Sequence, residues 1–266
     1  MKIGFIGLGN MGGSLARLVA QDERYRSELL LANRSRDKAE KIAAEIGGQS
    51  VSNAEIFAQA EVIFLGIKPA QFADLLADYR KILEKRDSLL LVSMAAGLSL
   101  ETLEKLTPRH HRWIRIMPNT PVAVGEGVIS YALSQQANQV DEDLLRELLS
   151  SAGLLVKLEE KQLDAATALA GCGPAFVYLF IEALADAGVR AGLSRNISLQ
   201  LANQTLLGAA KLSQVSGQHP AQLKDQVCSP AGSTIAGVAS LEENAFRGTV
   251  MAAVQAAYKR TQELGK

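Results

Sequence analysis

The sequence contains little of what disulfide frameworks, metal sites and membrane spans require. Its 266 residues include only two cysteines, Cys172 and Cys228, which are too few for a disulfide framework and lack metal-ligand spacing to the three histidines. Apolar runs such as 62–65 stay far below the roughly 18 residues that a membrane helix needs. We therefore expect reduced thiols in a cytoplasmic protein, with no bound metal and no membrane association.

An excess of charge of one sign is also missing. Lys and Arg together number 28, and so do Asp and Glu. A surface without a net field does not attract a polyanion, so a nucleic-acid partner is not expected. The chain also has no Ser-His-Asp arrangement and no pair of carboxylates at a spacing typical of catalysis. Hydride transfer needs neither, because a nicotinamide cofactor carries the difficult chemistry.

The first part of the chain has the pattern of a parallel sheet. Short β-branched runs alternate with amphipathic stretches of helical period, which is typical of βαβ units. The fold class is therefore α/β, with a Rossmann-type domain and a mostly parallel sheet over residues 1–160. The expected strands are 2–6, 28–32, 61–65, 88–93, 113–117, 128–131 and 154–157, and the expected helices are 11–20, 36–46, 70–82, 100–106 and 142–151.

From residue 161 to residue 266 no further β-branched run occurs, and Ala and Leu recur at helical spacing. This part is expected to be an all-α domain. The segment 174–191 is apolar over more of its circumference than one core contact uses, which indicates either a second subunit packed on it or an ordinary buried central helix. The expected helices are 161–170, 174–191, 195–214, 220–226, 231–242 and 245–264.

A Gly-x-Gly-x-x-Gly motif joins the first strand to the first helix. Gly7 permits a tight turn, Gly9 lets the backbone approach a pyrophosphate, and Gly12 lets helix and strand pack closely. Amides at a helix N-terminus then face the anion. We assign dinucleotide binding to this loop, that is, to Gly7, Leu8, Gly9, Asn10, Met11 and Gly12.

The end of the second expected strand favours NADPH over NADH. An NAD-selective domain has Asp or Glu there, whereas this chain has Asn33, Arg34 and Ser35. A guanidinium with neighbouring amide and hydroxyl groups pairs with a 2'-phosphate, which a carboxylate would repel. NADH remains possible, and Arg34 is alternatively a solvated surface arginine paired with Asp37.

Two further loops follow expected strands and lie at the same sheet edge, where ligands bind in open α/β sheets. The first is Ile67, Lys68 and Pro69, whose lysine would face the cofactor. The second spans residues 117–121, where Asn119 offers an amide beside the nicotinamide. Either loop is alternatively a structural turn.

In the helical part, a run of small residues over 228–234 precedes an expected helix beginning near Ala231. Helix N-terminal amides there would bind a carboxylate, with Ser233 and Thr234 offering hydroxyls. The alternative is a plain N-cap by Ser229 followed by Pro230. The candidate substrate-binding residues are Ser229, Ala231, Gly232, Ser233 and Thr234.

These motifs together resemble those of the pyrroline-5-carboxylate reductases over nearly the whole chain, and the similarity rests on residues 5–12, 67–69, 117–121, 171–176 and 219–237. The resemblance implies NAD(P)H-dependent reduction of the cyclic imine 1-pyrroline-5-carboxylate to L-proline, the last step of proline biosynthesis. It also implies a homodimer of interleaved helical domains, with a ring of dimers as a possible higher assembly.

The resemblance further assigns roles to single positions. Thr234 matches the catalytic threonine whose hydroxyl contacts the ring nitrogen, and the amides from Ala231 to Thr234 match those that hold the substrate carboxylate. Asn53 matches a residue at the adenosine, and Ala95 and Ala96 match positions at the nicotinamide.

The chain departs from the family pattern at Ala231, where glycine is common, and at Cys172, where serine is common. Ala231 matters only if the backbone there has positive φ or approaches the substrate closely. Two other functions stay open. One is a sister imine or β-hydroxyacid reductase. Such enzymes usually carry a lysine on the long helix that opens the second domain, and the segment 174–191 has none. The other is a non-catalytic NADP-binding sensor.

Overall fold

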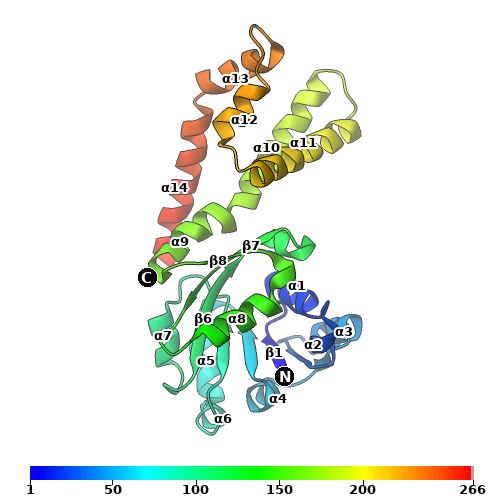
Figure 1. Ribbon diagram of the computed structural model, residues 1–266. Helices are drawn as coiled ribbons and strands as arrows, with labels where there is room; N and C mark the ends of the chain where they lie inside the picture. Colours follow the sequence, from blue (N-terminus) through cyan, green and yellow to red (C-terminus); the bar gives the residue numbers. More distant parts are fainter. Residues whose placement is uncertain (265–266) are drawn as a thin grey trace. The chain divides into compact units, whose positions relative to one another are not determined.

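The computed structural model describes residues 1–264 (Figure 1). Its internal contacts form two compact units, one of Met1–Cys172 together with the chain from Ala257 onward, the other of Gly173–Ala256. We call them the nucleotide unit and the helical unit. The expected domain boundary after residue 160 stays a prediction.

The nucleotide unit is built on one eight-stranded sheet with the order β3-β2-β1-β4-β5-β6-β7-β8. Strands β1 to β6 are parallel, β7 is antiparallel to β6, and β8 is parallel to β7. This confirms the mostly parallel sheet. The strands are β1 Ile3–Ile6, β2 Leu29–Ala32, β3 Gln49–Ser50, β4 Val62–Leu65, β5 Leu90–Ser93, β6 Arg112–Pro118, β7 Gly127–Leu133 and β8 Gly153–Lys157.

Helices cover both faces of this sheet, because side chains alternate along each buried strand. Phe5 packs on one face, where it stacks on Phe64 at 4.6 Å, and Ile6 packs on the other. The α-helices of this unit are α1 Asn10–Val19, α2 Glu23–Arg26, α3 Arg36–Ile46, α4 Asn53–Gln59, α5 Phe72–Asp78, α6 Arg80–Leu83, α7 Leu100–Lys105, α8 Gln139–Leu148 and α9 Leu163–Ala166. Helices α1, α3 and α8 contribute to the Phe5 face, and α4 to α7 contribute to the Ile6 face.

Short 3-10 and π turns complete the unit. They are η1 Pro69–Gln71, η2 Thr120–Val124, η3 Ser150–Ala152, η4 Glu160–Gln162 and the π-helical η5 Thr167–Gly171. Three of them take part where the sequence predicts a single helix. The expected helix 70–82 is divided into η1, α5 and α6, and the expected helix 161–170 is divided into η4, α9 and η5.

All seven expected strands are present, while one strand and two α-helices among residues 1–264 were not predicted. They are β3, α2 and α4. Strand β3 has only two residues, too few for a periodic pattern. Helix α4 begins after Ser52, whose hydroxyl accepts from the Glu55 amide while the Glu55 carboxylate accepts from the Ser52 amide. This Ser-x-x-Glu capping box is a sequence signal that could have predicted α4.

The helical unit contains α10 Gly173–Arg190, α11 Arg195–Ser216, α12 Pro220–Gln226, α13 Ser233–Glu243 and most of α14 Phe246–Leu264. Helix α13 begins at Ser233, so the expectation of a helix from Ala231 was wrong. The cause is the conformation of Ala231, whose φ of 56° is incompatible with a right-handed helix.

Few side chains of the helical unit are buried within the chain. Between Gly173 and Ala256 only Ala185, Ser198 and Ala202 are buried. On α10, Val177, Tyr178 and Leu179 are exposed, the last by 65%. By length and composition alone, the connected helices of Glu160–Arg190 are long and apolar enough to cross a membrane, and 11% of their most apolar stretch is buried. The expectation of no membrane association stays a prediction, because single helices of this length and composition also occur in soluble proteins.

Candidate active site

The glycine loop lies where the strand order of the sheet reverses. Strand β1 has β2 on one side and β4 on the other, so the connections that follow β1 and β3 run to opposite sides of it and leave a crevice at its carboxyl end. Gly7 follows β1 with φ of 92°, a conformation that favours glycine. A Cβ on Gly12 would lie 2.1 Å from the Gly7 carbonyl oxygen, whereas a Cβ on Gly9 would meet no atom within 4 Å. Gly12 is thus required by packing and Gly9 borders open space.

The start of α1 offers free backbone amides at this open space. Gly9 is its N-cap and supplies no side-chain acceptor, and Gly9 and Asn10 are exposed. The Leu8 amide is not free, because it donates to the Asn33 Oδ1 atom at 3.0 Å, and the Leu8 side chain is buried. Met11 is half-buried against the core of the Phe5 face. Free amides beside the Gly9 opening fit a pyrophosphate.

A cavity of about 410 Å³ continues from the end of β2. Its lining includes Asn33 and Asn53, two residues singled out from the sequence, together with Ala32, Arg36, Ser50, Val51, Ser52 and Glu55. Arg34 and Ser35 are exposed and do not line it. The Asn33 side chain also donates to the Ser35 carbonyl at 3.2 Å, so it organises this turn as well as the glycine loop.

Sequence reasoning missed Arg36, the arginine that lines this cavity. It opens α3 and pairs with Glu40 at 2.8 Å, both side chains being exposed. The signal was available, since two arginines follow Asn33 within three residues, but the sequence cannot tell which one turns toward the cavity. Hydrogen bonds from the Ser52 amide and hydroxyl hold the pKa of Glu55 below its usual range, and the charge of Arg36 adds to this.

The remaining cofactor candidates follow β4, β5 and β6. These strands are parallel and in register, since Leu65 pairs with Ser93 and Ser93 pairs with Arg115. Ile67 is half-buried, and Lys68 and Pro69 are exposed. The Ala95 amide donates to the Ser93 hydroxyl at 3.2 Å and its side chain is buried, while Ala96 is exposed.

Asn119, the last of these candidates, is buried and its side chain already has two partners. Its Oδ1 atom accepts from the Val128 amide at 2.8 Å, and its Nδ2 atom donates to the Ala170 carbonyl at 3.0 Å. Both polar atoms of its side-chain amide are therefore hydrogen-bonded to the protein's own backbone.

In the helical unit, residues Ser229 to Gly232 form a tight turn. The Gly232 amide donates to the Ser229 carbonyl at 3.0 Å, Pro230 is the second residue, and Ala231 has positive φ. Pro at the second position and positive φ at the third define a type II turn. A Cβ on Gly232 would lie 2.3 Å from the Ser229 hydroxyl. The alternative of Ser229 as N-cap is wrong, because Gly232 holds that position.

The turn presents the N-terminus of the eleven-residue helix α13 to solvent. Ser233 and Thr234 are its first two residues, and both side chains are exposed. Their amides have no partner within the helix, as is general for a first turn. The amide of Gly232 is engaged in the turn, so of the four amides singled out from the sequence, those of Ala231, Ser233 and Thr234 are the ones that the turn leaves open.

No histidine belongs to these loops in the part of the chain that the structure describes. His219 caps α12, since its Nδ1 atom accepts from the Ala221 amide. His111 is buried. Its Nδ1 atom accepts from the Leu89 amide at 3.2 Å, and its Nε2 atom contacts the Leu83 carbonyl at 3.1 Å. Burial lowers its pKa to about 4, with His110 adding to the effect.

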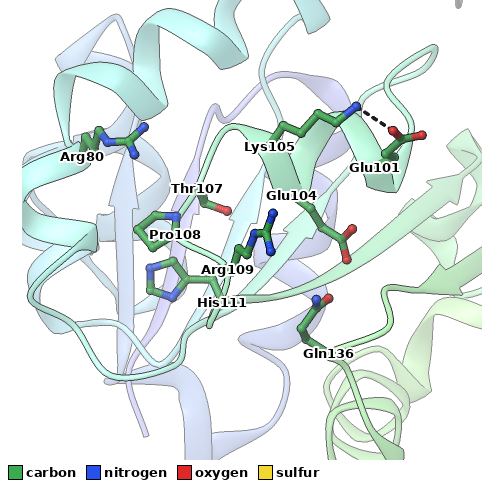
Figure 2. A pocket seen from close by; sticks show the side chains of 9 residues that line it. All are labelled: Arg80, Glu101, Glu104, Lys105, Thr107, Pro108, Arg109, His111 and Gln136. Carbon is green, nitrogen blue, oxygen red and sulfur yellow. Dashed lines mark hydrogen bonds and ion pairs between the residues drawn. The ribbon is translucent and has the colours of Figure 1, made fainter.

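A cavity of about 590 Å³ lies beside His111 at the start of β6 (Figure 2). Strand β6 ends at Pro118, so this cavity is at the edge of the sheet opposite the glycine loop. Glu101 and Lys105 on its rim pair with each other at 2.6 Å. Within residues 1–264 no group of His, Cys, Asp and Glu side chains is arranged to hold a metal.

Comparison with known protein families identifies both parts of the chain. Residues 160–264 match the profile described as pyrroline-5-carboxylate reductase dimerisation. Residues 2–97 match the profile described as NADP oxidoreductase, coenzyme F420-dependent. The first match covers α10 to α14, which bury so few side chains, and the second covers the glycine loop.

Full-length relatives give the same result. The chain is 44% identical to pyrroline-5-carboxylate reductase of Pisum sativum over 98% of its own length and 95% of the relative's. It is 40% identical to that of Synechocystis, over 100% and 99%.

Two solved structures also match along the whole chain. The pyrroline carboxylate reductase of Plasmodium falciparum with NADP bound is 36% identical, with a TM-score of 0.89, over 100% of this chain and 98% of that one. The pyrroline-5-carboxylate reductase of Coxiella burnetii is 30% identical, with a TM-score of 0.92, over the same shares.

Proposed function

The chain belongs to the pyrroline-5-carboxylate reductase family, and we propose that it reduces the C=N bond of 1-pyrroline-5-carboxylate to give L-proline, the last step of proline biosynthesis. It is an oxidoreductase that uses NADPH, with NADH as the alternative cofactor. The observation that carries this proposal is the combination, in one chain, of an open Gly-x-Gly-x-x-Gly loop and the small-residue turn before α13. The glycine loop has amide donors for the pyrophosphate of the cofactor, and the turn before α13 has amide and hydroxyl donors for the substrate.

The glycine loop and the cavity beside it bind the cofactor in this proposal. Gly9 admits the pyrophosphate to the amides of Asn10 and Met11, and Asn33 and Asn53 flank the adenosine. Arg36 joins Arg34 and Ser35 in pairing with the 2'-phosphate, which is where the NADPH preference arises. Lys68 and Ala96 are exposed at the edge where the nicotinamide belongs.

The turn before α13 binds the substrate carboxylate. The amides of Ala231, Ser233 and Thr234 lie at the exposed N-terminus of α13, where a negative charge is stabilised. The Thr234 hydroxyl then hydrogen-bonds the ring nitrogen and orients the imine. NADPH, when bound, supplies the hydride to the ring carbon, and the nitrogen of the protonated imine becomes the amine of proline. A strong acid is not needed, which agrees with the positions of the histidines.

We propose further that the exposed helices pair with a second copy of the chain, and that the enzyme is a cytoplasmic homodimer able to form rings of dimers. The apolar segment Glu160–Arg190 serves this contact and not a membrane. It is interrupted by the π turn η5 and carries the charges of Glu182, Asp186 and Arg190. A span of hydrocarbon disfavours such charges.

The test is the oxidation of NADPH, and separately of NADH, by the purified protein with 1-pyrroline-5-carboxylate, with proline identified as product. Thr234→Ala is expected to lower kcat/KM by about tenfold or more, because one hydrogen bond of up to about 1.5 kcal/mol is lost at the reacting nitrogen. Ser233→Ala is the matched comparison and should lower kcat/KM less than Thr234→Ala does, since it removes a hydroxyl one residue away and keeps the amide that binds the carboxylate. Thr234→Ser should recover most of the activity. Measurable NADPH binding without any proline formed would refute the proposal.

A further inference from the structure

Asn119 joins two sequence motifs that lie 51 residues apart. It follows β6 in the loop 117–121, and its side chain reaches Ala170 in η5, directly before Gly171-Cys172-Gly173-Pro174. Its main chain is fixed as well. The Asn119 amide donates to the Val128 carbonyl at 3.1 Å, and its carbonyl accepts from the Val122 amide at 3.3 Å. The residue is 7% exposed, so its side-chain bonds are largely protected from water.

The partner of Asn119 in η5 is a carbonyl that lacks its regular helical donor. In an α-helix the carbonyl of Ala170 would accept from the amide of residue 174, but residue 174 is proline and has no N–H. The turn is also widened, since the Cys172 amide donates to the Thr167 carbonyl five residues earlier at 2.9 Å. Such π turns inside helices are frequent at functional sites.

We propose that Asn119 is a positioning residue of the reductase, which replaces the missing amide of Pro174 and thereby fixes the wide turn η5 to the loop after β6. The loop carries the main chain at the sheet edge where the nicotinamide belongs, and η5 leads directly into α10. Asn119 acts through these backbones and does not itself bind the cofactor.

This role differs from direct cofactor binding in what it predicts. Loss of a cofactor ligand raises the Kd for NADPH. Loss of a positioning bond leaves that Kd nearly unchanged and lowers kcat, because a misplacement of about 1 Å reduces the rate by up to about 100-fold. The role is defined for the proposed reaction, so wild-type turnover of 1-pyrroline-5-carboxylate is the first measurement. If the wild type forms no proline, the proposed function fails, whatever the variants do.

The experiment is a double-mutant cycle of Asn119→Ala and Pro174→Ala. Alanine at 174 supplies a backbone N–H for the Ala170 carbonyl, so the bond from Asn119 becomes dispensable. We expect Asn119→Ala to lower kcat by about 10- to 100-fold, with the NADPH Kd from fluorescence titration within about twofold of wild type. In the Pro174→Ala background the same substitution should lower kcat by about threefold or less.

Two further variants keep the test decisive. Asn138→Ala is the matched control, because the Asn138 Oδ1 atom accepts from the Val140 and Asp141 amides and caps α8 away from both loops. It should lower the melting temperature without changing kcat. If Asn119→Ala does not fold, Asn119→Asp keeps an acceptor for the Val128 amide and sets a carboxylate oxygen, which cannot donate, against the Ala170 carbonyl. Equal effects of Asn119→Ala in both backgrounds, or an NADPH Kd raised as much as kcat/KM is lowered, would overturn the proposal.

Discussion

The nucleotide unit and the helical unit differ in where their apolar side chains find cover. In the nucleotide unit two clusters of buried residues fill both faces of the sheet, with Trp113, Tyr131 and Phe64 among the side chains that are fully buried. In the helical unit Gly173–Ala256, only Ala185, Ser198 and Ala202 are buried. Exposed apolar surface on this scale marks an interaction site.

The difference shows that one sequence can encode two kinds of core. The nucleotide unit completes its core from its own strands and helices, so its stability is a property of one chain. The helical unit has apolar helices and no such core, and the match to a dimerisation profile over residues 160–264 explains why. Its core is expected to form when a second copy covers it, which makes its stability depend on protein concentration.

The largest expected effect is the loss of the dimer when a charge is placed in the helical unit, compared with a charge placed in the nucleotide unit. Leu179→Glu places a carboxylate on the exposed apolar face of α10, where leucine is 65% exposed. A charge buried without a partner in the dimer costs roughly 3–5 kcal/mol per copy. We therefore expect a monomer in sedimentation analysis and loss of reductase activity.

The matched substitution is Val140→Glu in the nucleotide unit. Val140 is 72% exposed and is the second residue of α8, where a carboxylate is favoured. This variant should remain dimeric and active. If both variants stay dimeric, α10 is not the covered surface and the contrast between the units is lost.

The second prediction concerns the self-contained core of the nucleotide unit. Gly12→Ala puts a Cβ 2.1 Å from the Gly7 carbonyl oxygen, so we expect a loss of roughly 2–3 kcal/mol of unfolding free energy together with cofactor binding. Gly9→Ala meets no protein atom, and it should lower NADPH affinity at an unchanged melting temperature. Thermal melts and fluorescence titration separate the two. A stable Gly12→Ala that binds NADPH normally would show that the loop is less tightly packed than the structure indicates.

The third prediction is a pH dependence in the same unit. The folded pKa of His111 is about 4, below the unfolded value of about 6.5, because burial disfavours the charged ring. The unfolded chain therefore binds the extra proton first as the pH falls. The stabilisation from neutral His111 is complete above about pH 6.5 and is lost between about pH 6.5 and 4, by up to roughly 3 kcal/mol.

Urea unfolding at several pH values measures this loss. In His111→Gln the amide can keep one acceptor and one donor for Leu89 and Leu83 but does not titrate, so the slope of stability against pH between 4 and 6.5 should become smaller. An unchanged slope would assign the acid sensitivity to other groups.

The smallest expected effect is in the helical unit at Ala231. Glycine at this position removes roughly 1 kcal/mol of strain from positive φ, while the freer unfolded chain offsets about 0.4–1 kcal/mol of it. Ala231→Gly should therefore change the melting temperature by no more than about 2 °C. A more mobile turn holds the carboxylate less well, so we expect KM for the pyrroline to rise about two- to threefold at unchanged kcat. A lower KM would mean that the Cβ hinders the substrate.

Local patterns were enough to predict much of the fold and the geometry of the glycine loop. Every expected strand is present, and Gly7, Gly9 and Gly12 occupy the turn, the opening and the close contact that their spacing indicates. Helix α3 begins and ends at the expected residues 36 and 46. Helix α4 could have been predicted from Ser52 and Glu55. The position of Arg36 on the cavity could not, because neighbouring exposed arginines give no signal of direction.

The sequence by itself determined the α/β and all-α character of this protein, the geometry of the glycine loop and the family, because periodicity and glycine spacing act over a few residues. Only the tertiary structure decided that Asn119 bonds the carbonyl of Ala170, that His111 is buried and neutral, and that Ala231 has positive φ. These features depend on which backbone atoms meet after residues up to 51 positions apart have packed together. Burial and hydrogen-bond partners are set by that packing, and no local pattern specifies them.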